Sequence, residues 1–351
     1  MASGKRHKHI LVIRLSAMGD VAITVPVLRA LTQQHPNVKV TVVSRGHFKP
    51  FFDGLPNVYF FEPDLKRRHK GFFGILKLYK DLRKLHVHAV ADLHNVLRSK
   101  IVTFLFSLRG KKTATTNKFR DERAALTALK ADKVITPLPP VTQRHADVFA
   151  QLGYPIDVNA AAFPPKQPLT EDITDVTGPK TGKWIGIAPF AQHTGKVYPK
   201  DLMHQVIDSL LTDANNTLYL FGGGRHEAKL LDEFAQERPN IIVIAGAQLI
   251  LKQELKLISN LDLMISMDSG NAHMAAMLGV PVVTLWGATH PYAGFAPFKQ
   301  PLSNALTASR EQYPMLPTSI YGNKIIEGYE DAMRTIAPQT VVDKIDELLN
   351  K

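Results

Sequence analysis

Short apolar runs alternate with amphipathic, helix-like stretches along the whole chain, and this alternation limits the possible folds more than any other feature. In the first half, strands are predicted at 9–15, Val38–Ser44, Val58–Glu62 and Val87–Asp92, with one helix through about Gln34 that carries Pro26 near its first turn and another that opens at His94. Apolar strands separated by helices are typical of parallel sheets covered on both faces. The expected fold class is therefore α/β, with doubly wound sheets.

The second half repeats this pattern after a break. Strands are predicted at Trp184–Ala188, Thr217–Phe221, Ile241–Ala245, Leu263–Met267 and Val282–Trp286, and helices at about 199–212 and 328–351. The stretch Ala160–Pro179 is rich in Pro, Thr and Asp and lacks periodicity, so it is the predicted linker. A chain of 351 residues exceeds one ordinary core, which favours two domains. Two Rossmann-like halves predict ligand binding at the carboxyl ends of the strands and between the domains.

Composition excludes several classes of protein. The chain has no cysteine, which excludes disulfides, thiolate zinc sites and cysteine nucleophiles. Every long apolar stretch is broken before about 18 residues, so we expect no membrane-spanning helix. The apolar run at 10–13 is too short for the core of a signal peptide, and we expect a cytoplasmic protein.

Charge is divided unevenly between the two halves. The chain carries a net charge of +12, of which residues 1–165 contribute +16 (27 Lys and Arg against 11 Asp and Glu) and residues 166–351 contribute −4 (16 against 20). This asymmetry indicates a polyanionic partner of the first half: nucleic acid, an anionic membrane or a phosphorylated substrate. The alternative is that the charge serves solubility alone.

The basic residues are densest between Lys66 and Lys84. Lys66, Arg67, Arg68 and Lys70 precede Phe72 and Phe73, and a leucine stripe with helical spacing follows. One interpretation is a basic amphipathic helix on an anionic membrane, with these four cations in contact with a polyanion. The other is a core-facing helix with a solvated basic side.

The loop at 16–20 follows the first predicted strand and leads into a helix. Gly19 allows a ligand to approach the backbone closely. Asp20 at the helix start is either a helix cap or a general base, and the residues alone favour the cap.

Three segments of the second half combine strand ends with small or charged residues. Glycines at 222–224 open a helix after a strand, where backbone N–H groups can bind phosphate. Asp268-Ser269-Gly270 ends another strand and also opens a helix, with His273 one turn later as either a ligand-binding or a buried structural histidine. Lys196 lies on a post-strand loop, where it either opposes a leaving diphosphate or is simply exposed.

Taken in order, these segments resemble glycosyltransferase family 9, the bacterial lipopolysaccharide heptosyltransferases. The matching segments are residues 14–26 (R-L-S-x-x-G-D-V-x-x-T-x-P), Asp92-Leu93 with Arg98-Ser99, residues 196–199 with Tyr198 in place of Trp, Asp268–Pro281 (D-[ST]-G-x-x-H-x-A-x-x-L-G-x-P), and Gly287–Pro291, in which His290 replaces the usual acidic residue. The resemblance spans about residues 9–298.

The resemblance implies a GT-B architecture, in which two Rossmann-like domains face one cleft. Residues 1–165 would bind the acceptor, 166–327 would bind the nucleotide-sugar, and the helix at 328–351 would pack back on the first domain. Asp20 would be the general base, and Lys196 would stabilise the departing diphosphate. The implied donor-binding residues are Gly222, Gly223, Asp268, Ser269, Gly270, Asn271 and His273. The implied acceptor-binding residues are Ser16, Gly19, Arg98 and Arg120.

The resulting prediction is an inverting glycosyltransferase that moves heptose from ADP-heptose to a lipopolysaccharide core or lipid A-linked acceptor. The expected partners are the nucleotide-sugar, a phosphorylated saccharide-lipid and the anionic surface of the inner membrane, with no nucleic acid. We expect a monomer, peripherally associated with that membrane. The sequence has no Asp-x-Asp motif suited to a nucleotide-bound metal, so no metal cofactor is expected. A nucleotide-sugar epimerase of the same architecture and a non-catalytic sugar-nucleotide binding protein remain alternatives.

Overall fold

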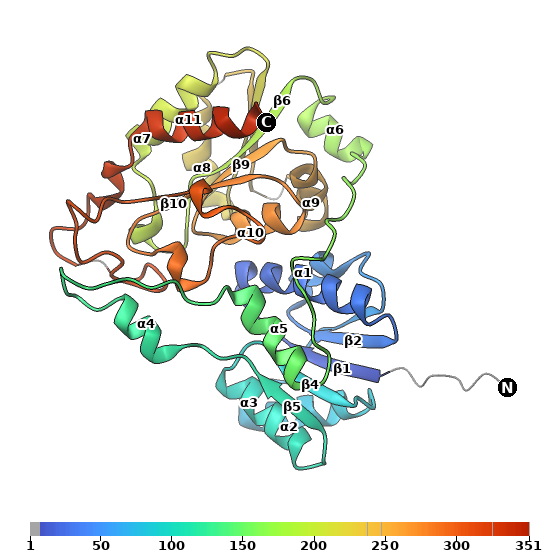
Figure 1. The fold of residues 1–351 in the computed structure, drawn as a ribbon. Coiled ribbons are helices and arrows are strands. Elements are labelled where there is room, and N and C mark those ends of the chain that lie inside the picture. Colours follow the sequence, from blue (N-terminus) through green and yellow to red (C-terminus); the bar gives the residue numbers. More distant parts are fainter. Residues whose placement is uncertain (1–7, 237, 247, 325, 351) are drawn as a thin grey trace. The chain divides into compact units, whose positions relative to one another are not determined.

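The computed structural model describes residues 8–236, 238–246, 248–324 and 326–350 (Figure 1). It forms two compact units: unit 1 comprises the chain up to residue 118 together with 141–162, and unit 2 comprises 119–140 and 163–351. The sequence placed one boundary at 165/166, close to the observed change at 162/163, but it did not assign 119–140 to the second unit. The interpretation of the N-terminus rests partly on residues 1–7, which lie outside the described residues.

Unit 1 contains a five-stranded parallel sheet in the order β3-β2-β1-β4-β5. Its strands are β1 (Lys8–Ile13), β2 (Val38–Val43), β3 (Val58–Phe61), β4 (Ala89–Asp92) and β5 (Lys112–Thr115). Its helices are α1 (Met18–Gln34), α2 (Gly71–Arg83), α3 (Leu97–Ser107) and α5 (Val141–Gln151), with a 3-10 helix η1 at Gly46–Phe52. The four predicted strands are confirmed. The sequence analysis missed β5, since the polar edge strand KTAT carries no apolar run.

Helix α1 differs from the prediction in where it begins. It starts at Met18, so Pro26 lies in the middle of the helix and not near its first turn. Proline removes a helical hydrogen bond, and packing must compensate for this loss. Residues 21–32 of α1 are buried throughout, so the compensation comes from contacts with the rest of unit 1.

Helix α2 decides between the two interpretations of the basic segment. Its leucine stripe, with Ile75, Leu78 and Leu82, belongs to the core of unit 1, while Lys77 and Lys80 are exposed. The stripe is therefore a core-facing surface and not a membrane-facing one. Phe72 and Phe73, in the first turn of α2, remain exposed.

Unit 2 contains a six-stranded parallel sheet in the order β11-β10-β9-β6-β7-β8. Its strands are β6 (Lys183–Ala188), β7 (Asn216–Phe221), β8 (Ile241–Ile244), β9 (Leu263–Met267), β10 (Val282–Trp286) and β11 (Ala305–Thr307). Its helices are α4 (Arg120–Leu126), α6 (Glu171–Thr177), α7 (Lys200–Leu210), α8 (Gly224–Ala235), α9 (Leu251–Ser259), α10 (Gly270–Met277) and α11 (Pro338–Leu349). Its 3-10 helices are η2 (Thr194–Lys196), η3 (Pro291–Ala293), η4 (Leu302–Asn304) and η5 (Ala332–Thr335). The five predicted strands are confirmed.

Two expectations for unit 2 are wrong. The predicted linker contains a short helix, α6, whose Ile173 is fully buried. The described part of the C-terminal stretch is helical at 332–335 and 338–349 and not throughout 328–351. Helix α11 belongs to unit 2, and its packing on the first domain stays a prediction. Its apolar face, formed by Val341, Val342 and Ile345, is part of the core of unit 2, where α11 packs against α7. This packing buries the apolar face of α11 within its own unit.

The strand order of each sheet fixes where ligands can bind. In an open parallel sheet, the crevice lies where neighbouring strands send their connections in opposite directions. That switch point lies between β1 and β4 in unit 1, and between β6 and β9 in unit 2.

Across the described ranges, none of the helices has the length and apolar character that crossing a membrane requires.

Candidate functional site

Asp20 lies in the first turn of α1, directly after the end of β1. Its Oδ2 atom is 2.5 Å from Arg14 Nη2, and it accepts a hydrogen bond from Ala17 N at 3.3 Å. Arg14 also donates to the Leu93 carbonyl oxygen at 2.7 Å, which anchors the guanidinium to the loop after β4. The N-cap residue is Ala17 and not Asp20, but the Asp20 carboxylate reaches back to the N-cap backbone from the third helical position. Its ion pair with Arg14 fixes its orientation at the switch point. The role of general base remains a prediction.

The charges of Arg14 and Asp20 affect the pKa values of two histidines. Burial, together with the nearby positive charge of Arg14, lowers the pKa of His94 to about 4, while the charge of Asp20 opposes the shift. Burial lowers the pKa of His145 in α5 to about 3, with Arg14 and Asp20 acting in the same two directions. Both imidazoles are therefore neutral at pH 7. The sequence analysis missed them as part of this site, because nothing local to α5 links it to β1.

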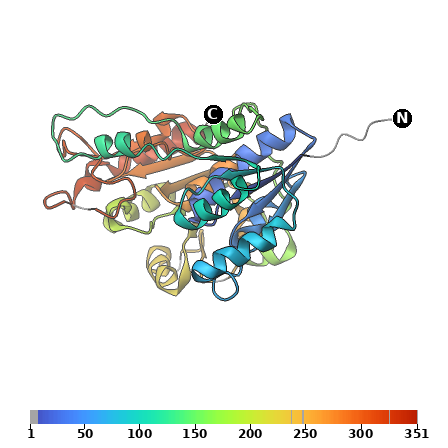
Figure 2. The same ribbon diagram turned by 90° about the horizontal axis from the view of Figure 1, so that it is seen from below.

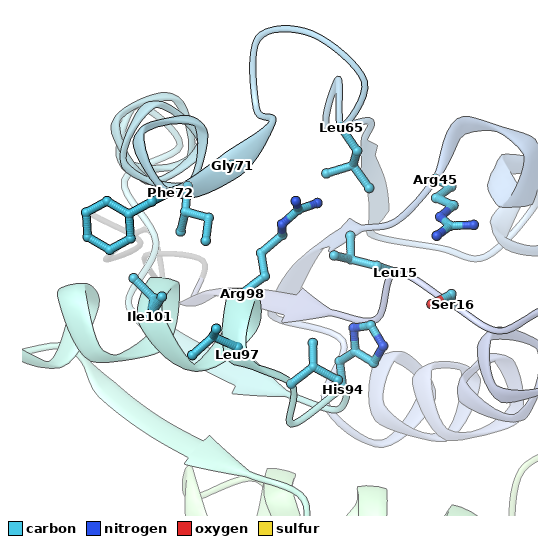
Figure 3. A pocket seen from close by; sticks show the side chains of 12 residues that line it. Leu15, Ser16, Arg45, Leu65, Gly71, Phe72, His94, Leu97, Arg98 and Ile101 are labelled. Atoms are coloured by element: carbon cyan, nitrogen blue, oxygen red, sulfur yellow. The ribbon is translucent and has the colours of Figure 1, made fainter.

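A cavity of about 490 Å³ opens beside this ion pair in unit 1 (Figure 3). Leu97, Ile101 and Phe72 contribute apolar walls, and the guanidinium of Arg98 extends between these walls and Arg45. Among the described residues, neither arginine forms an ion pair. The cavity therefore suits a ligand with an anionic group and a less polar portion.

The predicted acceptor-binding residues only partly come together. Ser16 and Arg98 line the cavity, and Gly19 lies beside Asp20 in the first turn of α1. Arg120 begins α4 in unit 2 and does not line the cavity. Arg45 was not predicted, since it is separated from the other residues in sequence and lies in no matched motif.

The Asp92-Leu93 and Arg98-Ser99 motif builds the turn that carries these side chains. Asp92 Oδ1 accepts hydrogen bonds from the backbone N–H groups of His94 at 2.9 Å and Asn95 at 2.8 Å. Ser99 Oγ accepts from Val96 N at 3.0 Å. Asp92 is fully buried, and burial raises the pKa of its carboxyl group against these hydrogen bonds. The motif is structural here, and it presents Arg98 to the cavity.

The basic loop before α2 is only partly free to contact a polyanion. Arg68 donates to both carboxylate oxygens of Asp81, at 2.8 and 3.0 Å, so its charge is already paired. Lys66, Arg67 and Lys70 are exposed. The predicted polyanion surface therefore keeps three of its four cations.

In unit 2, Lys196 and Asp268 form an ion pair with Nζ and Oδ2 3.3 Å apart. Lys196 belongs to the turn after β6, and Asp268 directly follows β9. These strands are neighbours at the switch point, so two predicted residues far apart in sequence meet there. Their side chains are only 13% and 9% exposed, which means that Lys196 is not a simple surface lysine.

Helix α10 begins two residues after Asp268. Ser269 is the N-cap residue, yet its hydroxyl bonds to Ser266 Oγ at 2.9 Å and does not cap the helix. Gly270 and Asn271 form the first turn, whose backbone N–H groups point along the helix axis toward the switch point. His273 is buried one turn later. This arrangement suits a diphosphate, but the donor-binding roles remain predictions.

The glycine loop after β7 differs from the expectation. Gly223 N donates to Oε2 of Glu227 in α8 at 2.6 Å, so this N–H group is not available to phosphate. Gly222 has little room, since an added Cβ atom would lie 2.9 Å from Leu231 Cδ1. The loop thus presents a carboxylate, which suits hydroxyl groups better than phosphate. Glu227 was missed because its role depends on how the helix folds back on the loop.

The loop that carries Lys196 is clamped from several sides. Tyr198 is buried, and its hydroxyl donates to the Ile336 carbonyl at 2.6 Å. Ala288 N donates to the Gly195 carbonyl at 2.8 Å. Gly322, at φ +79°, packs against the aliphatic stem of Lys196, so that an added Cβ atom would lie 2.4 Å from Lys196 Cγ. These contacts fix the ammonium group beside Asp268.

His290, which departs from the family motif named in the sequence analysis, carries no positive charge at pH 7. Its Nδ1 atom accepts a hydrogen bond from Tyr292 N at 3.1 Å. Burial lowers its pKa to about 4, and the charges of Arg310 and Lys133 act in the same direction. The ring is therefore neutral at pH 7.

In the part of the chain that the structure covers, no group of three or more His, Cys, Asp or Glu side chains is placed to hold a metal ion.

Comparisons with known proteins agree with this arrangement. The family model described as glycosyltransferase family 9 (heptosyltransferase) matches residues 75–329. Lipooligosaccharide heptosyltransferase 2 of Haemophilus influenzae is 25% identical, with 98% of this chain and all of that protein covered. The crystal structure of a family 9 glycosyltransferase from Veillonella parvula has a TM-score of 0.74 at 20% identity, covering 100% of this chain and 99% of that one. Escherichia coli heptosyltransferase WaaC with ADP has a TM-score of 0.65 at 19% identity, covering 97% and 99%. The likeness confirms the predicted GT-B fold class.

Proposed function

The chain belongs to glycosyltransferase family 9, and from this premise we propose that it transfers heptose from ADP-heptose to a lipopolysaccharide core or lipid A-linked acceptor. The enzyme is a glycosyltransferase. Heptosyltransferase relatives, one of them solved with ADP, support the choice of sugar and nucleotide. Family membership also favours transfer over the epimerase and binding-protein alternatives.

Unit 1 binds the acceptor in this proposal. Arg45 and Arg98 offer two guanidinium groups without ion-pair partners among the described residues, and guanidinium groups bind phosphate and carboxylate in a bidentate manner. The apolar walls around them suit the less polar faces of a saccharide. A phosphorylated or carboxylated saccharide-lipid has both kinds of group.

Unit 2 binds the donor. The first turn of α10 and the ammonium group of Lys196 flank the β6–β9 switch point, where a diphosphate gains from both N–H groups and positive charge. The carboxylate of Glu227 suits hydroxyl groups of the nucleotide. Asp268 fixes the position of Lys196 and balances its charge before the donor binds.

The reaction is a single displacement. Asp20 takes the proton of an acceptor hydroxyl as that oxygen bonds to the anomeric carbon, and the bond from that carbon to the diphosphate breaks. ADP leaves with the bonding electrons, and Lys196 stabilises the added negative charge. Attack opposite the leaving group inverts the anomeric centre. We expect no metal requirement, because Lys196 and the helix N-terminus supply the stabilisation.

One observation carries the proposal: a carboxylate held by Arg14 lies at the switch point beside a cavity that contains two arginines. The test is to incubate the protein with ADP-heptose and the saccharide-lipid acceptor in the presence of EDTA. We expect ADP release that depends on the acceptor, and a glycosylated product with inverted configuration. ADP should stabilise the protein in a thermal-shift assay more than UDP or GDP does. Donor consumption without acceptor, or full dependence on added Mg²⁺ or Mn²⁺, would contradict the proposal.

The place of action follows from the acceptor. A lipid-linked acceptor lies in a membrane, and we propose that the enzyme acts as a monomer at the cytoplasmic surface of the inner membrane. The exposed cations Lys66, Arg67 and Lys70 support contact with an anionic surface or with acceptor phosphates. Fractionation of cells should place the protein with membranes at low salt and release it at high salt.

A further inference from the structure

Five large apolar side chains of unit 1 are exposed on two neighbouring helices. These residues, which we call the α2–α3 patch, are Phe72 (62% exposed), Phe73 (77%), Leu97 (74%), Phe104 (58%) and Leu108 (67%). Single exposed apolar residues are ordinary on protein surfaces, but contiguous groups mark interaction surfaces. The patch is separate from the leucine stripe of α2, which is buried.

The five side chains lie in one strip along two helices that pack on each other. Leu97, Phe104 and Leu108 recur at spacings of seven and four residues, which places them on one side of α3 and its C-cap. Helices α2 and α3 pack side by side against the same face of the sheet (Figure 1 and Figure 2). Phe72 and Leu97 line the same cavity, and the rings of Phe72 and Phe73 lie 5.9 Å apart. The strip therefore runs from the start of α2 to the end of α3.

Several cations that form no ion pair with a described residue lie next to the strip. Residues 66–118 contain 14 Lys and Arg but only two carboxylates, Asp81 and Asp92. Asp81 pairs with Arg68 and Lys84, and Asp92 is buried. Asp64, just before this range, accepts hydrogen bonds from the backbone of Arg67 and Arg68. The exposed cations next to the strip are Lys66, Arg67, Lys70, Lys100, Arg109 and Lys111.

We propose that the α2–α3 patch inserts shallowly into an anionic lipid bilayer. Exposed aromatic and leucine side chains with a border of lysine and arginine have the chemistry of an interfacial anchor: the apolar side chains enter the acyl boundary while the cations meet lipid headgroups. A second copy of this chain would bring like charges together, and a nucleic acid would leave the apolar strip without a partner. The inference rests on the proposed function only in that the acceptor lies in the same bilayer.

The test measures binding to vesicles of phosphatidylglycerol and phosphatidylcholine that contain no acceptor. The triple variant F73S/F104S/L108S removes patch residues that do not line the cavity, and V134S/I250S/L302S changes three exposed apolar residues of unit 2 as the matched control. We expect the patch variant to bind about tenfold more weakly and to lose the binding that persists at high salt. The control should bind like the parent. Both variants should keep the parent melting temperature, because the substituted side chains are exposed.

A second pair of variants tests the border of cations. K66S/R67S/K70S should lower affinity at low salt by about fivefold for each residue that faces the bilayer, and K166S/K229S/K252S is the control with three exposed lysines of unit 2. Binding of the parent to neutral vesicles as tightly as to anionic ones would overturn the role of the charges. Equal vesicle binding by the parent and F73S/F104S/L108S would overturn the proposal. So would a parent dimer in sedimentation velocity that this variant abolishes, or salt-sensitive nucleic-acid binding tighter than vesicle binding.

An activity assay separates this proposal from the proposed function. A deacylated, water-soluble acceptor needs no membrane, so F73S/F104S/L108S should transfer sugar to it within about twofold of the parent rate. If the parent protein transfers sugar but does not bind vesicles, the membrane anchor is wrong and the proposed glycosyltransferase activity stands. If the parent binds vesicles through the patch but transfers no sugar, the anchor stands and the proposed activity is wrong.

Discussion

The β1–β4 switch point of unit 1 and the β6–β9 switch point of unit 2 occupy equivalent places in parallel sheets of related topology, yet their charges differ. In unit 1, Arg14 pairs with Asp20, and Arg45 and Arg98 add two positive charges in the adjoining cavity. In unit 2, Lys196 faces Asp268 at 3.3 Å, and the start of α10 supplies N–H groups. One site has excess positive charge, and the other is nearly balanced.

This difference shows how each site can recognise an anion. A diphosphate of fixed shape can bind to oriented N–H groups at a helix start, with one fixed cation nearby. An acceptor that carries several anionic groups requires excess charge, which unit 1 provides. Under the proposed function, the net charges of +16 and −4 in the two halves match an anionic acceptor in the first half and not the nucleotide.

The largest effect is expected at Asp20. Asp20→Asn should lower turnover by about 10²–10⁴-fold, because the acceptor hydroxyl loses its base. ADP affinity by calorimetry should change less than about twofold, since the donor binds in unit 2. Asp157→Asn is the matched control: Asp157 also caps backbone, accepting from Asn159 N at 2.9 Å, but far from the switch point in sequence. If both variants lose the same turnover, or if Asp20→Asn loses donor affinity, Asp20 is only a cap.

Lys196 should give the next largest effect. Lys196→Met should lower turnover by about 10²–10³-fold, because charge on the departing diphosphate is no longer stabilised. The variant leaves Asp268 without its partner, so the double variant K196M/D268N tests whether the loss is merely structural. Lys200→Met removes an exposed lysine that lies four residues after Lys196 and pairs with Glu233, and it should cost little. Recovery of activity in the double variant would assign Lys196 to stability and not to chemistry.

A smaller effect is expected at Gly322, which touches the stem of Lys196. Gly322→Ala should lower turnover about tenfold, since the new Cβ atom must displace Lys196 from its place beside Asp268. Gly328→Ala is a closely matched control, because Gly328 has the same φ of +79° and nothing within 4 Å of an added Cβ atom. Equal losses of turnover and melting temperature in the two variants would point to backbone strain alone.

The last effect concerns the dependence of stability on pH and not turnover. Burial lowers the pKa of His145 to about 3, below its ordinary value of 6.5, so the unfolded state binds more protons at acidic pH. The free energy of unfolding should therefore fall as pH drops below about 6.5, by a total on the order of a few kcal/mol. His145→Gln should flatten this slope in denaturant titrations, and the exposed His47→Gln should not. If the free energy of unfolding of His145→Gln falls with pH as steeply as that of the parent, His145 is not the cause of this dependence.

The sequence predicted the features that depend on short stretches of chain. Nine strands, the loops that follow β1, β6 and β9, and the placement of Asp20, Lys196 and Asp268 at strand ends all follow from local apolar runs and motifs. Parallel sheets then bring the ends of adjacent strands together, which is why Lys196 and Asp268 meet.

Features that depend on packing between distant segments could not be predicted. His145 reaches the switch point through the packing of α5, and the pairing of Arg68 with Asp81 depends on the fold of the loop before α2. Glu227 takes the N–H group of Gly223 only because α8 begins with a tight turn. The apolar face of α11 gave no sign of which unit it would cover.

The comparison between the two switch points is tested most directly by calorimetric titration of ADP and of a deacylated, phosphorylated acceptor into three proteins: the parent, Arg98→Gln and Asp268→Asn. We expect Arg98→Gln to weaken acceptor binding by about tenfold or more, because a charge-assisted hydrogen bond is lost, and to leave ADP binding unchanged. We expect Asp268→Asn to change ADP binding and to leave acceptor binding unchanged, since Lys196 loses its partner in unit 2. Weaker ADP binding in Arg98→Gln, or weaker acceptor binding in Asp268→Asn, would contradict the division of acceptor and donor between the two units.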